Sequence, residues 1–293
     1  MRWQSIARCL IGMNGRAMRA MRWRLICSEP ASGAWNMALD EAMLLAHFMG
    51  LTPPTLRLYR WTPPALSLGL LQPCNEEWER RCASMGFDLV RRPSGGGAVL
   101  HQHEVTYAVV VDGRLCPQGS SVLTTYRWLE GGLRAALKRL GIEPDPPFSP
   151  DRPVPSASFC YARLTGADLS VGGRKLCGSA QARRRNFLLQ HGSLPLRWDV
   201  AALRHLFGGE EMSLTCLEWL SEKPLTPEAV MDALKQGFEQ ALGVTFVEGD
   251  LTPREKAVAD LLYRAKYGSS AWTKERQVAF EVRERVERML KSA

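Results

Sequence analysis

The sequence predicts an α+β fold in which helices flank a mixed β-sheet. The chain has 293 residues, of which 45% are hydrophobic, and this is enough to bury the core of one large domain. Strand-like and helix-like segments follow one another without an internal repeat. No stretch approaches the roughly 18 uninterrupted apolar residues of a membrane helix, and the mean hydropathy is −0.18. We therefore expect a globular protein of enzyme size that does not span a membrane.

Helices and strands are mixed along the first half of the chain. Apolar residues at helical spacing predict a long helix over 32–49, which Ser32 is placed to cap. Strand-like patterning begins at Met21, and the VTYAVVV segment has the β-branched and aromatic residues of a central strand. The other elements expected here are strands at 55–59, 65–70 and 87–91, a helix over 76–85 ending at Gly86, and a helix over 126–140 ending at Gly141.

The second half begins with a break. Six prolines between residues 144 and 155 predict a long surface loop, because proline fits neither a helix interior nor a central strand. Two strands around Gly172-Gly173 then predict a hairpin whose glycines supply positive φ. The remaining expected elements are a strand over 186–194, a helix opened by Thr226-Pro227 and closed by Gly243, another opened by Thr252-Pro253, and a last helix over 275–290.

Charge and composition set the first 20 residues apart. They hold four arginines and no acid, so half of the net charge of +8 lies there, and they lack the apolar core of a secretory signal. We predict a disordered or non-native leader over 1–20, a main domain over 21–250 and a small helical appendage over 251–293. The mild charge of the remainder and the absence of an arginine and aromatic stripe argue against a nucleic-acid-binding module.

The cysteines and histidines show no metal-binding pattern. None of the eight cysteines forms a CxxC pair, and the five histidines form neither an HExxH motif nor a finger spacing. We therefore predict no metal site and reduced thiols in a cytoplasmic protein.

The densest motif is RRPSGGGAVLH, which runs from Arg91 to His101. Three consecutive glycines are costly to order. They suit a place where backbone amides must approach a phosphate or carbonyl oxygen closely, although a tight turn between strands would also explain them. The candidate binding residues in this motif are Arg92, Ser94, Gly95, Gly96, Gly97 and His101.

A second motif, GGRKLCGSAQ, places a lysine on a strand directly after the hairpin turn. Lys175 on a rigid strand can aim its ammonium at an acyl carbonyl or a phosphate, whereas a lone lysine is more often a solvated side chain. The further candidates for binding are Gly178, Ser179, Ala180 and, on the following strand, His191. For both His101 and His191, a hydrogen-bonded packing role is the simpler interpretation.

Taken together, RRPSGGGAVLH, GRKLCGSAQ and LQHGS resemble the lipoate/biotin protein ligase superfamily, in the branch of lipoate ligases and octanoyltransferases. The resemblance runs from about Met21 to the end of the chain. It implies a mixed sheet with flanking helices, related to the catalytic core of class II aminoacyl-tRNA synthetases. The main domain, 21–250, would then be the catalytic domain.

Two details favour the octanoyltransferases within this superfamily. The segment from His101 to Tyr107 is similar to their HxxELTY form rather than to the HDxGN form of ATP-dependent ligases. These transferases also carry a nucleophilic cysteine before an aromatic residue ahead of the lysine hairpin, and Cys160 followed by Tyr161 stands there. The rival thiol, Cys177, occupies a slot that relatives fill with a small apolar residue, so we interpret it as packing.

The resemblance implies an acyltransferase with Cys160 and Lys175 as catalytic residues. Octanoyl-acyl carrier protein would acylate Cys160, and a lysine of a lipoyl-domain protein, such as glycine cleavage H protein or a dehydrogenase E2 subunit, would accept the group. Lys175 would stabilise the oxyanion and the thiolate. We expect no cofactor and a monomer. The alternatives are an ATP-dependent lipoate ligase and an amidotransferase acting between lipoyl domains.

Overall fold

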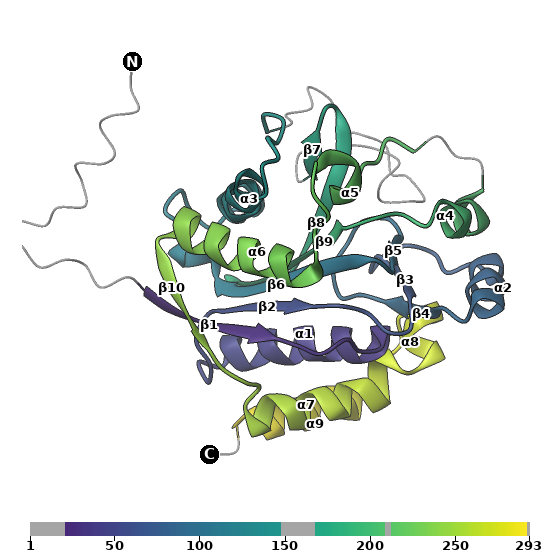
Figure 1. Ribbon diagram of the computed structural model, residues 1–293. Helices are drawn as coiled ribbons and strands as arrows, with labels where there is room; N and C mark the ends of the chain where they lie inside the picture. Colours follow the sequence, from purple (N-terminus) through teal and green to yellow (C-terminus); the bar gives the residue numbers. More distant parts are fainter. Residues whose placement is uncertain (1–20, 148–167, 209–211, 292–293) are drawn as a thin grey trace, which may run out of the picture.

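A mixed seven-stranded sheet forms the centre of the protein, as Figure 1 shows for the computed structural model, which describes residues 21–147, 168–208 and 212–291. Its strand order is β10-β1-β2-β6-β9-β8-β7. Strand β1 pairs in parallel with β2 and β10, and the other pairs are antiparallel. The strands are β1 (Met21–Cys27), β2 (Thr55–Tyr59), β6 (Glu104–Asp112), β7 (Asp168–Val171), β8 (Arg174–Arg184), β9 (Phe187–Pro195) and β10 (Val244–Glu248). The α+β prediction is confirmed.

A second, three-stranded sheet stands beside the first and carries the glycine motif. Its order is β4-β3-β5, with β3 parallel to β4 and antiparallel to β5. The strands are β3 (Ala65–Leu68), β4 (Asp88–Arg91) and β5 (Val99–His101). Strand β4 ends shortly before the three glycines, and β5 begins shortly after them. Both ends of the segment that carries the glycines are therefore fixed to one sheet.

Helices cover both faces of the large sheet (Figure 1). One face packs against α3 (Val122–Arg139) and α6 (Pro227–Leu242), and the other against α1 (Gly33–Phe48). Helix α7 (Pro253–Leu262) packs on α1, and α9 (Phe280–Lys291) packs on α7 as an outer layer (Figure 1). The small sheet packs against α2 (Glu76–Met85) and α4 (Val200–Phe207). The short helical segments are η1 (Gly113–Leu115), α5 (Leu217–Leu220), η3 (Tyr263–Tyr267), which is a π-helix, and α8 (Ser270–Glu275).

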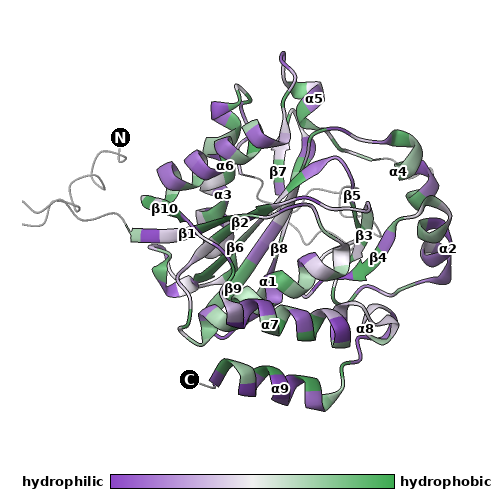
Figure 2. Cartoon of the chain, turned by 60° about the horizontal axis from the view of Figure 1, so that its bottom comes forward, coloured by the Kyte–Doolittle hydropathy of each residue, from purple (hydrophilic) through white to green (hydrophobic). Residues whose placement is uncertain are grey.

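Alternation along β6 shows how the large sheet is buried on both faces. Val105 and Val109 belong to the core under α3 and α6, whereas Ala108 and Val110 belong to the core under α1. This follows from the two-residue period of a strand. Figure 2 shows the apolar residues concentrated on the central strands and the hydrophilic ones on the outer helices. A strand that is apolar on both sides therefore marks the middle of the sheet.

Local capping signals fixed most helix ends as expected. Ser32 accepts a hydrogen bond from the Trp35 amide, and Gly86 ends α2 in the left-handed conformation. Thr252 and Glu255 form a reciprocal capping box at the start of α7. Helix α3 begins four residues before the predicted position, because Ser121 rather than a later residue caps it. Strand β10, the π-helical turn and α8 were not predicted.

The C-terminal helices contact the base of the glycine segment. Trp272 Nε1 donates to the Arg91 carbonyl at 2.9 Å, and Arg91 Nε donates to the Thr273 carbonyl at 2.8 Å. Helix α7 shares a hydrophobic core with α1. The division at residue 250 stays a prediction, and the leader over 1–20 lies outside the described residues. In the described part of the chain, no helix combines the length and apolarity needed to cross a membrane.

Candidate active site

The glycine loop, defined as residues 92–98, is held from inside by the first of its own side chains. The buried guanidinium of Arg92 donates from Nη2 to the carbonyls of Gly95 and Gly97, each at 2.7 Å. From Nη1 it donates to the carbonyl of Ser67 on β3 at 2.9 Å. Five donors in a fixed fork suit several carbonyl acceptors at once. Arg92 is a predicted substrate-binding residue. In the structure, its hydrogen bonds hold the glycine loop in shape.

Glycine is required at two positions around this loop. A Cβ on Gly69 would lie 1.9 Å from the carbonyl oxygen of Gly96, so the two backbones meet directly. Gly96 itself has a φ of +94°, which other residues rarely adopt. A Cβ on Gly95 would meet nothing within 4 Å. Close backbone approach and positive φ therefore explain why residue 96 is a glycine. Packing does not require a glycine at position 95.

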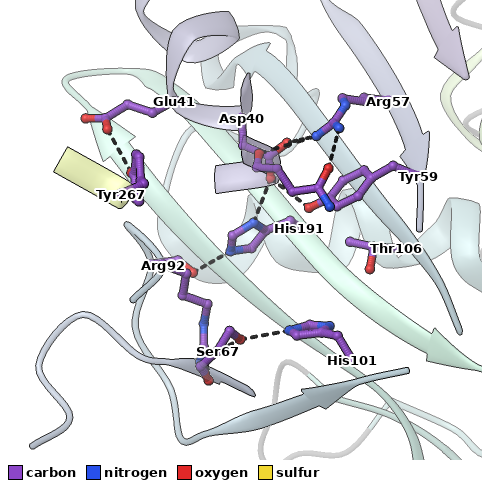
Figure 3. Close-up of polar contacts among 12 residues, drawn as sticks. Asp40, Glu41, Arg57, Tyr59, Ser67, Arg92, His101, Thr106, His191 and Tyr267 are labelled. Atoms are coloured by element: carbon purple, nitrogen blue, oxygen red, sulfur yellow. Dashed lines mark hydrogen bonds and ion pairs between the residues drawn. The ribbon is translucent and has the colours of Figure 1, made fainter. Parts of the chain in front are cut away.

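His191 on β9 connects the glycine loop to helix α1, as the close-up in Figure 3 shows for its link to Asp40. Its Nε2 lies 2.5 Å from Ser94 Oγ, and its Nδ1 lies 3.1 Å from Asp40 Oδ2. Asp40 also accepts from Arg57 and from the Tyr59 hydroxyl, both at 2.9 Å. Burial and the neighbouring Asp40 carboxylate raise the pKa of Tyr59 well above its ordinary value. His191 is therefore a buried, hydrogen-bonded residue that fixes Ser94.

His101, at the end of β5, lies in a second buried network. Its Nδ1 is 2.6 Å from Glu104 Oε1, and its Nε2 is 2.8 Å from Ser67 Oγ. The ring stacks on Trp61, whose Nε1 donates to Thr106 Oγ1 at 2.8 Å. Thr106 in turn donates to Glu104 at 2.5 Å. These bonds fix the orientation of the imidazole against an aromatic surface.

A cavity of about 50 Å³ lies between the two networks. It brings together three groups of residues that the sequence analysis singled out, from the glycine loop, from β8 and from the two histidines. The predicted residues that line it are Arg92, Gly96, Gly178, Ser179, Ala180, His101 and His191. Ser94 and Gly95 do not line it, but Ser94 contacts the lining residue His191.

Lys175 lies at the start of β8, three residues before the cavity-lining Gly178. Its side chain is 1% exposed, and its Nζ forms an ion pair with Asp168 Oδ1 at 2.7 Å. The backbone is held as well, because Lys175 N donates to the Ser213 carbonyl and Thr215 N donates to the Lys175 carbonyl, both at 2.9 Å. Lys175 is thus not a solvated side chain, which was the alternative interpretation.

The structure describes only one of the two cysteines that the sequence analysis compared, Cys160 and Cys177. Cys160, the predicted nucleophile, lies outside the described residues. Cys177 is completely buried in the main core, as expected for a packing residue. Burial first, and then the Asp168 carboxylate, raises the pKa of Cys177 far above its ordinary value. Cys177 therefore stays a neutral thiol.

Three residues of the site were missed, namely Asp40, Glu104 and Asp168. Asp40 lies in the apolar helix α1 and is fully buried. Glu104 and Asp168 are the first residues of strands that are almost entirely buried. The usable signal was a charged residue within a segment predicted to be buried, because such a charge needs a buried partner. Among the described residues, no three His, Cys, Asp or Glu side chains gather as a metal site would require.

Comparison with known proteins shows one family match, similar sequences and similar structures. The model of the lipoyl protein ligase A/B catalytic domain matches residues 32–239. Proteins named octanoyltransferase LipM from Kyrpidia tusciae and Symbiobacterium thermophilum are each 39% identical, and each alignment covers 85% of this chain and 97% of the relative. A T. acidophilum protein described as a lipoate protein ligase, solved with bound lipoic acid, has 25% identity and a TM-score of 0.73, over 87% of this chain and 99% of that one.

Proposed function

Since the chain belongs to the lipoyl protein ligase A/B catalytic-domain family, we propose that it is an octanoyltransferase of protein lipoylation. The observation that carries this proposal is the match to octanoyltransferases over 97% of their length at 39% identity. A buried lysine on β8, three residues before the cavity-lining Gly178, supports it, because a fixed positive charge near the reacting carbonyl oxygen would stabilise the transition state of acyl transfer.

The proposed reaction has two steps through Cys160. The Cys160 thiol loses its proton, and the thiolate attacks the thioester carbonyl of octanoyl-acyl carrier protein. The carbon–sulfur bond to the carrier breaks, the carrier leaves as a thiol that takes up one proton, and an octanoyl-enzyme thioester forms. The ε-amine of a lysine on a lipoyl-domain protein then attacks this thioester. An amide forms, and the Cys160 thiol is restored. Because the donor is already activated, the proposal includes no ATP and no cofactor.

The described residues supply binding and orientation in this scheme. The Lys175 ammonium stabilises the oxyanion of each tetrahedral intermediate and favours the Cys160 thiolate. The carbonyl end of the acyl group would lie at the cavity between the glycine loop and β8, whose volume of about 50 Å³ does not hold the whole octanoyl chain. His101 and His191 hold the loop and the cavity wall through their buried hydrogen bonds. Gly95, with open space at its Cβ position, leaves the loop backbone accessible to the donor.

We further propose the partners and setting that this chemistry requires. The donor is octanoyl-acyl carrier protein, and the acceptor is a lipoyl-domain protein such as glycine cleavage H protein or an E2 subunit. A cytoplasmic location suits a mechanism that needs a reduced thiol. We expect a monomer. We also expect no binding to nucleic acid, since half of the net positive charge lies in residues 1–20.

An ATP-dependent lipoate ligase is the second candidate, favoured by the fold shared with the T. acidophilum protein. Intact mass measurement separates the two. Mixed with octanoyl carrier protein and no ATP, the wild type should gain an octanoyl adduct that hydroxylamine removes, and Cys160→Ser should gain none. Acylation of a lipoyl domain only with free acid and ATP, with no adduct on the enzyme, would establish the ligase instead.

A further inference from the structure

Asp168 and Lys175 face each other on the two strands of the β7–β8 hairpin. The carboxylate is 3% and the lysine side chain 1% exposed, and Oδ1 and Nζ are 2.7 Å apart. Asp168 opens β7, and its register partner on β8 is Gly178, one of the residues that line the cavity. The ion pair therefore lies at the same part of the sheet as the candidate active site.

The hairpin that carries the pair is held rigidly at its turn. Gly172 and Gly173 both adopt positive φ, and their amides donate to Asp145 at 2.9 and 2.8 Å. The amide of Lys175 is fixed by Ser213 as well. Since the backbone of Lys175 is fixed, the direction of its flexible four-carbon side chain depends on what its ammonium contacts.

Burial alone would act against the charge that the proposed mechanism needs. Taking an ammonium out of water favours the neutral amine, and an opposite charge in contact reverses that preference. Asp168 supplies this charge at hydrogen-bond distance. A second contribution of the carboxylate is seen at Cys177, whose pKa it raises in addition to burial. Asp168 therefore acts on both titratable neighbours along β8 and favours the cationic lysine with a neutral buried thiol.

In the described part of the chain, further titratable and charged groups near the pair come from α3, from β6 and from the glycine loop. Tyr126 on α3 interacts with Asp168, and burial raises the pKa of Tyr126 to about 12, so this phenol is neutral. Glu104 on β6 interacts with Cys177 and is bonded to His101. Arg92, bound to glycine-loop carbonyls, adds positive charge near Tyr126. An Asp168 substitution leaves these neighbours in place, so they are common to the wild type and the variant in the test.

We propose that Asp168 is a positioning residue for acyl transfer, which aims the Lys175 side chain at the reacting carbonyl and keeps it in the ammonium form. This inference rests on the proposed octanoyltransferase function. It adds a residue that acts through Lys175 and does not itself touch the octanoyl group.

The test measures the rate of octanoyl-adduct formation on the enzyme in a single turnover, from pH 6 to 10. Asp168→Asn removes the charge and keeps the shape. We expect its rate at pH 7 to fall about 10- to 100-fold, as for other residues that orient a catalytic group through hydrogen bonds. The alkaline limb of the profile should also move to lower pH, because the lysine loses its proton more readily without the carboxylate beside it. Asp168→Glu should keep the wild-type alkaline limb at a reduced rate.

Asp145→Asn is the matched control, because Asp145 holds the same hairpin turn without contacting Lys175. A loss that comes only from a loosened hairpin would appear in this variant too, with an unchanged pH profile. Wild-type rate and profile in Asp168→Asn would overturn the inference. If Asp168→Asn does not fold, a wild-type rate in Asp168→Glu would overturn it equally. Failure of the wild type itself to form an adduct would instead contradict the proposed function.

Discussion

Trp61 stacks on His101 with ring centroids 3.8 Å apart and planes inclined by 10°. Both residues line the candidate cavity, and Trp61 also bonds Thr106 on the central strand β6. The stack therefore joins the small sheet, which carries the glycine loop, to the large sheet. This stack and the contact between Ser94 and His191 both hold the small sheet and its loop against the large sheet.

Removing the Trp61 ring should damage stability and catalysis together. Trp61→Ala leaves a cavity and removes one of the two hydrogen bonds of the Thr106 hydroxyl, so we expect a loss of about 3–5 kcal/mol in the free energy of unfolding. Trp61→Phe keeps the stack without the Nε1 donor and should lose about 1 kcal/mol. Urea unfolding of both variants checks this. Equal losses in the two would show that the stack contributes nothing beyond the hydrogen bond.

Two glycine substitutions should separate the folding role of the glycine loop from its binding role. Gly69→Ala sets a Cβ against the Gly96 carbonyl, so we expect it to destabilise the protein by about 3 kcal/mol or more. Gly95→Ala has open space and should change stability by no more than about 0.5 kcal/mol. Thermal unfolding measures both effects.

The activity of Gly95→Ala then tests the binding role. If the loop backbone approaches the acyl donor at this position, the stable variant should have a raised KM for octanoyl carrier protein. An unchanged KM would exclude Gly95 from the binding surface. The glycine at position 95 would then be explained only by a tight turn between strands.

His47 should make the protein less stable as the pH falls. Burial lowers the pKa of His47 below its ordinary value; Nδ1 bonds the Thr52 carbonyl at 2.7 Å, and the buried Nε2 has no partner among the described residues. As the pH falls, the unfolded chain protonates His47 before the folded protein does. The neutral His47 therefore makes its full contribution to the free energy of unfolding above the unfolded pKa of about 6.5, and this contribution is lost as the pH falls through and below that value.

The measurement is the unfolding free energy from pH 8 to pH 5. His47→Asn should give a flatter dependence than the wild type, because it keeps a donor for Thr52 and has no group that titrates there. The exposed His205 is the control site, and His205→Asn should follow the wild-type curve. A wild-type slope in His47→Asn would contradict the assignment.

Alkylation should distinguish the buried thiols from the accessible ones. Cys177 and Cys82 are at most 1% exposed, and burial raises the pKa of both, that of Cys82 to about 12. In the folded protein at pH 8, iodoacetamide should leave them unmodified, while Cys27 and the proposed nucleophile Cys160 react. Peptide mass analysis reads each site. Rapid labelling of Cys177 would contradict its packing role.

The sequence predicted the parts of the site that local residue pattern determines. Ser32, Gly86 and Thr252 end helices through contacts within a few residues, and each was placed correctly. The glycine motif and the lysine hairpin were also found, because three glycines and a paired-glycine turn constrain the backbone locally.

Contacts between distant segments were beyond the same reasoning. Asp40 and His191 are 151 positions apart, and nothing near either residue in the sequence indicates the other. Strand β10 is short and gains its order by pairing with β1, more than 200 residues earlier. The Asp168–Lys175 pair is closer in sequence, but a lysine on a strand reveals its partner only once the hairpin register is known.

The paired hydrogen bonds between Arg91 and the Trp272–Thr273 backbone and side chain also bear on how the chain folds during synthesis. The strand that leads into the glycine loop is made early, yet its anchor is translated about 180 residues later. At roughly 5–20 residues per second, the ribosome needs at least about 9 seconds to reach that anchor. A nascent chain stopped before Trp272 therefore lacks the contact that anchors the strand leading into the glycine loop.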